Sequence, residues 1–210
     1  MDPKKFWDRM AGRYDRQALG RYGKSYEETV AIAGKYLKPM DTLLDYACGT
    51  GITSIPIAAA VRRVVAIDLS DKMIRIAREK AKCSGIENIT FKTTTIEDPD
   101  LINDAFDVIT AFNILHGLKE VETVLLRIRT LLKEGGFLLS VTDCLGEKKS
   151  LAGILYTFLS KIAIIPHVNL FKRNDLTEII TAAGFSVIEE KQLYPSPPNY
   201  FIAAVKIADK

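Results

Sequence analysis

The sequence contains few of the residues that build disulfide frameworks and metal sites. Its 210 residues include three cysteines, Cys48, Cys83 and Cys144, and two histidines. An odd number of scattered cysteines argues against a disulfide framework and fits a reducing compartment. Two histidines and three dispersed thiols also do not form the ligand clusters that hold zinc and similar ions, so we expect no metal site.

The chain also lacks a long apolar run and a strong excess of one charge. Its longest apolar stretch, Leu151 to Ile165, is interrupted by Ser160 and Lys161 and is shorter than the ~20 residues that a membrane-spanning helix needs. No apolar segment follows the first five residues, so no signal peptide is indicated. The net charge of +3 is too small to indicate a nucleic-acid partner. We therefore expect a soluble, cytoplasmic protein without stable membrane insertion.

The composition that remains is that of an ordinary globular protein, 48% hydrophobic and 26% charged. Short apolar runs, expected as strands, alternate with segments expected as helices. The strands are expected at 42–46, 63–68, 89–93, 106–112 and 137–142, and the helices at 4–19, 24–38, 52–60, 71–83 and 119–132. This alternation predicts an α/β fold with a doubly wound, mostly parallel sheet that carries helices on both faces.

The alternation ends after the fifth expected strand. Residues 147–165 are expected to form an apolar helix that stops at Pro166, and 173–183 a second helix that ends at Gly184. Two strand-like runs follow, at 185–193 and 200–207. We expect them to form an antiparallel hairpin at the edge of a seven-stranded sheet.

The most informative segment of the chain is Leu43 to Gly51 together with Asp68. Gly49 and Gly51 allow a tight turn after the first strand and a close approach of the backbone to a ligand. Asp68 ends the second strand, where a carboxylate can accept two hydrogen bonds from a ribose diol. Ser54 replaces the third glycine of a dinucleotide-binding loop, and no Gly-Lys-Ser/Thr follows, which excludes a P-loop. The pattern indicates a nucleoside-binding unit.

The run Asp-Tyr-Ala-Cys-Gly-Thr-Gly at residues 45–51 resembles the first motif of the class I S-adenosylmethionine-dependent methyltransferases. The resemblance extends from Phe6 to about Ile207, and the nearest group is that of small-molecule enzymes such as those of quinone biosynthesis. It implies a Rossmann-like fold and a single methyltransferase domain over residues 1–210. Its expected parts are an N-terminal helical lid (1–38), a cofactor-binding half (39–145), a substrate cap (146–171) and a C-terminal helix and hairpin (172–210).

The same resemblance implies which residues bind S-adenosylmethionine. The glycine loop would hold the methionine part with Asp45 orienting it, and Asp68 would hold the ribose. Ala47 stands where many members have glycine, which is tolerated if its φ is negative. Thr95 stands where relatives often have an aspartate near the adenine. The complete expected set is Tyr14, Asp45, Ala47, Gly49, Gly51, Asp68, Leu69, Met73, Thr95, Ile96 and Asn113.

His116 follows the fourth expected strand, whose end faces both cofactor and acceptor in the family. It is the candidate general base, because the pKa of a histidine lies near neutrality; the alternative is a histidine that is bonded to backbone. The Asn/Asp-Pro-Pro-Tyr/Phe motif of enzymes that methylate bases or amide nitrogens is absent here. Residues 197–200 contain similar residue types in a different order, in a hairpin turn, and are not interpreted as that motif.

The remaining aromatic residues are expected to shape the acceptor site, and the apolar cap favours a partly hydrophobic acceptor. The expected acceptor-site residues are Tyr14, Tyr22, Phe112, Asn113, His116, Tyr156, Phe158, His167 and Phe171. The predicted function is methyl transfer from S-adenosylmethionine to a small acceptor by a monomer or homodimer. Two alternatives stay open at this point. One is a nicotinamide-dependent oxidoreductase, for whose second substrate domain the chain has little room, and the other is a non-catalytic S-adenosylmethionine-binding protein.

Overall fold

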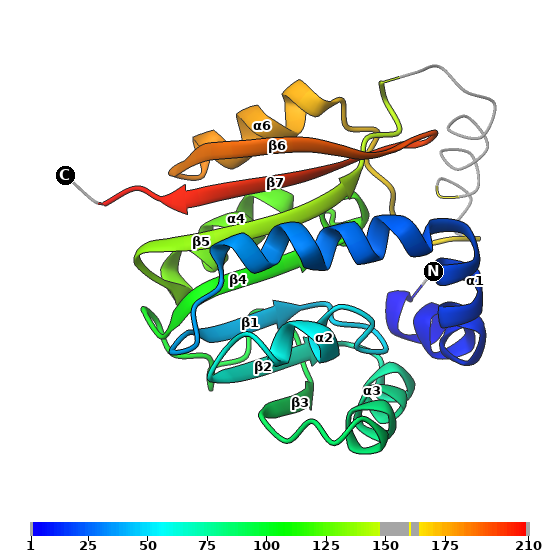
Figure 1. Ribbon diagram of the computed structural model, residues 1–210. Coiled ribbons are helices and arrows are strands. Elements are labelled where there is room, and N and C mark those ends of the chain that lie inside the picture. Colours follow the sequence, from blue (N-terminus) through cyan, green and yellow to red (C-terminus); the bar gives the residue numbers. More distant parts are fainter. Residues whose placement is uncertain (1, 148–159, 161–163, 209–210) are drawn as a thin grey trace.

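The computed structural model describes residues 2–147, 160 and 164–208, and its centre is one mixed sheet in the order β3-β2-β1-β4-β5-β7-β6 (Figure 1). Strands β1 to β5 run parallel, and β7 pairs antiparallel with both β5 and β6. The seven-stranded α/β fold with a C-terminal hairpin is therefore confirmed. The strands are β1 (Thr42–Tyr46), β2 (Arg63–Asp68), β3 (Ile89–Thr93), β4 (Phe106–Phe112), β5 (Leu132–Asp143), β6 (Phe185–Pro195) and β7 (Pro198–Lys206).

Helices cover both faces of this sheet. They are α1 (Pro3–Ala33), α2 (Ser54–Ala58), α3 (Asp71–Cys83), α4 (Val121–Leu131) and α6 (Arg173–Ala182), with 3-10 turns η1 (Gly34–Tyr36) and η2 (Leu115–Gly117). Successive strand residues point to opposite faces. Leu43 and Val64 accordingly pack with α1, α2 and α3, whereas Leu44 and Val65 pack with α4 and α6. Two apolar cores, one on each face, hold the sheet between them.

The order of the strands determines where a ligand can bind. The chain moves from β1 outward to β3 and then returns to β4 on the other side of β1. Loops that leave the carboxyl ends of β1 and β4 therefore diverge and open a crevice at this edge. The segments that reach it are the glycine loop after β1, Asp68 at the end of β2, Asn113 after β4 and Asp143 at the end of β5.

The two expected N-terminal helices are one element, which corrects the prediction for 4–19 and 24–38. Helix α1 runs from Pro3 to Ala33, and its only non-helical residue is Tyr22, with φ −123° and ψ 16°. The parts before and after this kink run in different directions (Figure 1). The helix also ends earlier than expected, because the chain is already extended at Leu37. Lys38 directly precedes Pro39, and the residue before a proline disfavours the helical conformation.

Further boundaries differ from the prediction, among them those of α2 and β5. The helix expected at 52–60 is only Ser54–Ala58, because residues 51–53 belong to the turn and Pro56 lies in its first turn without an N–H. Strand β5 is longer than 137–142 and begins at Leu132. Its register against β4 shifts between Phe106 and Val108, and this irregularity accommodates the extra residues before Phe137.

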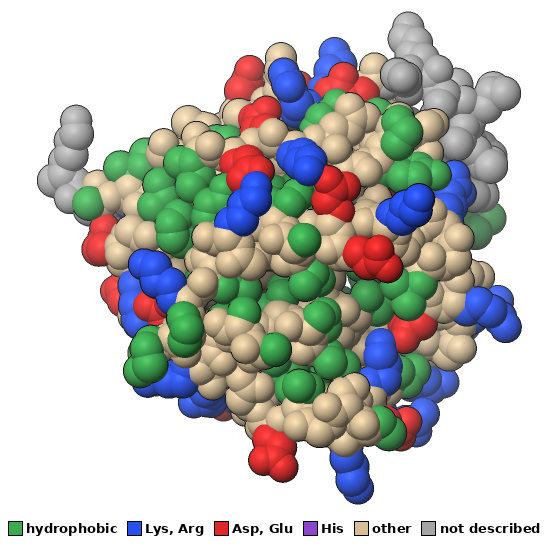
Figure 2. All heavy atoms as spheres, viewed as in Figure 1, with side chains coloured by type: hydrophobic (Ala, Val, Ile, Leu, Met, Phe, Trp, Pro, Cys, Tyr) green, Lys and Arg blue, Asp and Glu red, His purple; other side chains and the backbone are tan. Residues whose placement is uncertain are grey.

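The helix expected at 147–165 lies almost entirely outside the described residues, as do Tyr156 and Phe158. Over the part of the chain that is described, no helix combines the length and apolar character needed to cross a membrane. In the space-filling view of Figure 2, basic and acidic side chains are interspersed on this face. No large region of one charge sign is visible there, in agreement with the small net charge.

Candidate cofactor and acceptor site

The glycine loop after β1 has three residues with left-handed backbone. Gly49 has φ +55° and Gly51 has φ +76°, as a tight turn requires. A Cβ on Gly51 would lie 3.3 Å from Cδ1 of Ile55, a tight contact that the Ile55 side chain would have to relieve. The Cys48 amide donates to the Ile67 carbonyl at 3.0 Å, which fixes the start of the loop against β2. Cys48, Thr50 and Gly51 are buried, whereas Gly49 is half-buried at the crevice.

Ala47 contradicts the expectation of a negative φ, because its φ is +60°. A left-handed alanine places its Cβ close to the following carbonyl oxygen and costs about 1–2 kcal/mol. Many members of the resembled family avoid this cost with glycine. Such strain persists only where the surrounding structure fixes the backbone, and here the hydrogen bond from Cys48 to β2 directly follows the strained residue.

Asp68 links the glycine loop to the next loop. Its Oδ2 accepts from the Gly49 amide at 3.0 Å and its Oδ1 from the Ser70 amide at 2.8 Å. Burial raises the pKa of Asp68, and these amide bonds oppose the rise. Each carboxylate oxygen has more than one lone pair. One acceptor direction on each oxygen therefore remains for a vicinal diol, and the arrangement fits the ribose of a nucleoside.

Asp45 lies beneath the loop and is 1% exposed. Its two oxygens accept from Ser54 Oγ at 2.5 Å and from Thr110 Oγ1 at 2.7 Å. Asp45 therefore connects α2 to β4 below the glycine loop. The serine at the third position of the loop motif provides one of these bonds, which a glycine would not. Burial raises the pKa of Asp45 to about 6 in spite of the two hydroxyl donors.

This raised pKa predicts a pH effect on stability that Asp45→Asn removes. Folded Asp45 has a pKa of about 6 against an ordinary value of 3.8, so the folded state binds this proton more tightly than the unfolded state. Its contribution is complete below about pH 4 and is lost as the pH rises to about 6. The loss amounts to about 3 kcal/mol at 1.36 kcal/mol per pKa unit.

Urea unfolding at pH 4, 5, 6 and 7 measures this effect as the difference between the wild type and Asp45→Asn. Using the difference is essential, because burial also lowers the pKa of His116 and raises that of Asp68, so these groups contribute to the pH dependence of the wild type. Relative to the wild type, the variant is expected to gain stability as the pH rises from 4 to 6. Parallel curves would contradict the raised pKa.

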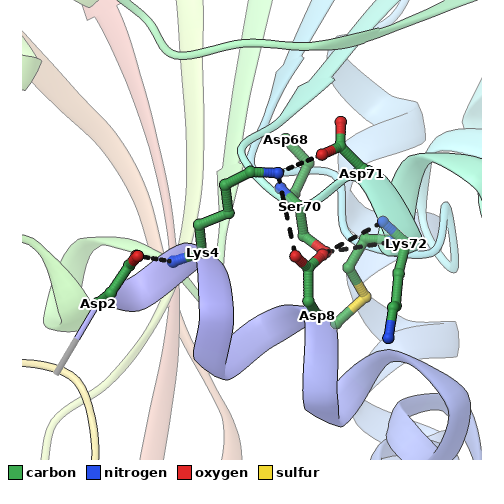
Figure 3. Close-up of polar contacts among 8 residues, drawn as sticks. Asp2, Lys4, Asp8, Asp68, Ser70, Asp71 and Lys72 are labelled. Atoms are coloured by element: carbon green, nitrogen blue, oxygen red, sulfur yellow. Dashed lines mark hydrogen bonds and ion pairs between the residues drawn. The ribbon is translucent and has the colours of Figure 1, made fainter.

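Helix α1 is attached to both loops that border the cofactor region. Figure 3 shows Asp8 and Lys4 of α1 facing the start of α3. Asp8 accepts from Ser70 Oγ at 2.6 Å and from the Lys72 amide at 3.3 Å, and Lys4 pairs with Asp71. These contacts join the helix to the residues that directly follow Asp68.

A second attachment reaches the glycine loop. Asp15 accepts from Thr50 Oγ1 and pairs with Lys80 Nζ of α3 at 2.7 Å. Asp8 and Asp15 are not among the expected cofactor residues, although both fall in the expected helical lid. Their spacing of seven residues places both on one side of α1.

The remaining expected cofactor residues surround the outer end of the crevice. Met73 and Ile96 are each 2% exposed, and Ile96 belongs to the core beneath α4. Leu69 is half-buried and Thr95 is exposed. The structure thus places all four near the ends of β2 and β3, with Leu69 and Thr95 the more accessible of them.

A cavity of about 570 Å³, here named the α1 cavity, lies between α1 and the ends of β4, β5 and β7. One face of α1 lines it at helical spacing, and five residues from the sheet side form its floor. The α1 residues are Phe6, Trp7, Met10, Tyr14, Gln17, Ala18, Arg21, Tyr22, Ser25, Tyr26 and Thr29, and those of the floor are Asn113, His116, Val141, Asp143 and Asn199. Tyr14, Tyr22, Asn113 and His116 are therefore together in one cavity.

A chain of polar contacts crosses this cavity. Asn199 Nδ2 donates to Asp143 Oδ1 at 2.7 Å and to Asn113 Oδ1 at 3.3 Å. Asn113 Nδ2 then donates to the Tyr26 hydroxyl at 3.5 Å, and the hydroxyls of Tyr26 and Tyr14 are 3.2 Å apart. Since Tyr26 accepts from Asn113, its own hydrogen is available to Tyr14. Asn113 also has φ +57°, a conformation that asparagine tolerates better than most residues.

His116 lies on η2 at the floor of the cavity. Its Nδ1 is buried and has no hydrogen-bond partner among the described residues. Burial lowers the pKa of His116, and the negative charge of Asp143 partly opposes this. The ring is therefore neutral at pH 7 and able to accept a proton. No acidic partner for His116 is apparent in the sequence, although Asp143 ends β5 just as Asp68 ends β2.

Three expected acceptor-site residues lie elsewhere. His167 Nε2 is 2.9 Å from Asn169 Oδ1, and Asn169 is in turn bonded to Leu118, so His167 belongs to a loop contact. Phe112 packs into the core on the α1 face, and Phe171 into the core on the α4 face. None of the three lines the α1 cavity.

Comparison with known proteins places this geometry in a family. The family model described as "Methyltransferase domain" matches residues 37–184. A ubiquinone biosynthesis O-methyltransferase of Rhizobium etli is 24% identical over 170 residues, which cover 78% of this chain and 68% of that relative. A demethylmenaquinone methyltransferase of Symbiobacterium thermophilum is 28% identical over 141 residues, covering 63% of this chain and 55% of that relative.

Among solved structures, phosphoethanolamine N-methyltransferase 2 of Haemonchus contortus is similar in fold. It was determined in complex with phosphomonomethylethanolamine and S-adenosylhomocysteine, and it matches with a TM-score of 0.80 at 17% identity over 99% of this chain and 61% of that chain. The chain therefore belongs to the methyltransferase-domain family and is a class I S-adenosylmethionine-dependent methyltransferase. Among the described residues, no group of three or more potential ligands is arranged to hold a metal ion.

Proposed function

We propose that this methyltransferase acts on a small, partly hydrophobic acceptor that binds in the α1 cavity. The observation that carries the proposal is the position of this cavity. Tyr14 and Asn113 line it, and Tyr14 Cε1 would lie 3.8 Å from a Cβ on Gly49, so the cavity adjoins the glycine loop. An apolar wall with a few polar anchors is the usual form of a small-molecule site.

The residues of the chain have separate tasks in this proposal. S-adenosylmethionine, when bound, supplies an activated methyl group on a positive sulfur. Asp68 and the glycine loop hold it, while α1 excludes water and holds the acceptor close and in line. His116, neutral and at the floor, accepts the proton of acceptors that need a base. The names of the Rhizobium and Symbiobacterium relatives support an acceptor with apolar character.

Calorimetry with S-adenosylmethionine, S-adenosylhomocysteine and NAD tests the cofactor part of the proposal. We expect binding of the first two and a much weaker interaction with NAD, because Ser54 replaces the third glycine of a dinucleotide-binding loop. Turnover is then measured as S-adenosylhomocysteine formation against a panel of small phenols, quinols and amines. Tighter binding of NAD would contradict the proposal, and cofactor binding without turnover of any acceptor would favour a non-catalytic binding protein.

A further inference from the structure

The α1 cavity combines aromatic rings with a carboxylate at its floor. We propose that the acceptor is an amine with an apolar substituent, and that Asp143 and the aromatic rings of α1 bind its protonated nitrogen. This inference rests on the proposed function, because it assigns the chemical class of the acceptor in the same cavity.

Asp143 is the first element of the argument. It ends β5, lines the cavity and is half-buried. Its Oδ1 accepts a hydrogen bond from Asn199, which is a neutral amide. Within the described part of the chain, no lysine, arginine or histidine forms an ion pair with Asp143. A partly desolvated carboxylate with no cationic partner favours a ligand that brings a positive charge.

The aromatic rings are the second element. Trp7 is the centre of a cluster in which Phe6 lies at 5.1 Å and Tyr14 at 6.0 Å, both edge to face at 84° and 86°. An edge-to-face contact covers at most one face of a ring, so other ring faces remain available to a ligand. The faces of tryptophan and tyrosine carry the negative side of the ring quadrupole and attract ammonium groups. All three residues line the α1 cavity.

The other charged or titratable side chains of the cavity do not reverse this preference. His116 is neutral at pH 7, since burial lowers its pKa. Arg21 also lines the cavity but is exposed, and its guanidinium carbon lies 5.2 Å from the centre of the Tyr22 ring. A phenolate or carboxylate acceptor at the floor would instead meet the like charge of Asp143. The cavity is therefore anionic at the floor.

The chemistry of transfer to an amine is balanced by groups already named. The bound ammonium first loses one proton, to His116 or to solvent. The nitrogen lone pair then forms the new N–C bond to the methyl carbon while the C–S bond breaks. The electron pair of the C–S bond returns to sulfur. The products are the methylated ammonium and S-adenosylhomocysteine.

The single tryptophan of the chain allows a direct binding test, because Trp7 lines the cavity. With the protein saturated by S-adenosylhomocysteine, its fluorescence is titrated with 2-phenylethylamine, 2-phenylethanol and phenylacetate at pH 7.5. We expect the amine to bind at least tenfold more tightly than the alcohol, and the carboxylate to bind most weakly. In Asp143→Asn, which keeps an acceptor for Asn199, the amine is expected to lose this advantage while the alcohol changes less than threefold. Glu122→Gln, an exposed charge on α4, is the matched control and should leave the preference unchanged.

Equal affinities for amine and alcohol, a preference for phenylacetate, or no binding of the amine up to 10 mM would each overturn the inference. A preference for the amine that survives in Asp143→Asn would overturn the role of Asp143. These outcomes are separate from failure of the proposed function. Methyl transfer to a phenol with no amine binding would leave that function standing, whereas loss of S-adenosylhomocysteine binding in the wild type would refute it.

Discussion

Asp68→Ala is expected to weaken the binding of S-adenosylmethionine and S-adenosylhomocysteine by at least tenfold. The two carboxylate oxygens are aligned by the Gly49 and Ser70 amides, and each keeps an acceptor direction for one ribose hydroxyl. Hydrogen bonds to a charged acceptor are worth roughly 1.5–3 kcal/mol each, and although the two contributions are not additive, loss of both exceeds tenfold. Calorimetry with both ligands measures the change.

Asp68→Asn is the matched comparison, since it keeps one acceptor oxygen but removes the charge and one acceptor. We expect its affinity to lie between those of the wild type and Asp68→Ala. A thermal melt of each variant checks that the glycine loop still folds, because Asp68 also binds that loop. Unchanged dissociation constants with an intact melt would mean that the ribose is bound elsewhere.

His116→Ala is expected to lower turnover by about 10²-fold or more while cofactor affinity stays nearly unchanged. The physical reason is that His116, which lines the floor of the α1 cavity, is our proposed proton acceptor and is not part of the glycine loop. Steady-state rates with a saturating acceptor, together with calorimetry of S-adenosylhomocysteine, separate the two effects.

Two further variants define what His116 does. His116→Gln keeps a polar side chain without a titrating nitrogen, so it should be as slow as His116→Ala if proton transfer matters. His167→Ala is the control, because this second histidine is bonded to Asn169 outside the cavity. A loss of only a few fold in His116→Ala, or recovery in His116→Gln, would reduce His116 to a positioning residue.

The architecture was predictable because the strands are encoded locally. Runs such as 63–68 and 106–112 are mostly apolar, as in strands that are buried on both faces, and the polar residues Asp68 and Asn113 mark their carboxyl ends. Boundaries were less predictable where tertiary contacts decide them. The helices expected at 4–19 and 24–38 form one helix that bends at Tyr22. The Tyr22 ring packs edge to face on Tyr194 of the distant strand β6, with the ring centres 4.9 Å apart.

The proposed cofactor site could be inferred from the sequence, because its glycines and Asp68 follow one another closely along the chain. The residues of the α1 cavity could not all be inferred, because they are brought together only by folding. Asn199 lies 86 residues after Asn113 and 56 after Asp143, yet it is bonded to both. Asn199 is expected in a hairpin turn but lies in β7, where it pairs with Asp143 of β5, and this pairing is not visible in the sequence alone.

The attachment of α1 through Asp8 and Asp15 has a consequence for the order of events in one catalytic cycle. Asp8 binds Ser70, which follows the proposed ribose ligand Asp68 closely, and Asp15 binds Thr50, between the two loop glycines. The same helix supplies most of the wall of the α1 cavity. We therefore expect these contacts to open when the cofactor enters and to re-form before the acceptor binds. We expect a compulsory sequence in which the nucleoside is the first ligand to arrive and the last to leave.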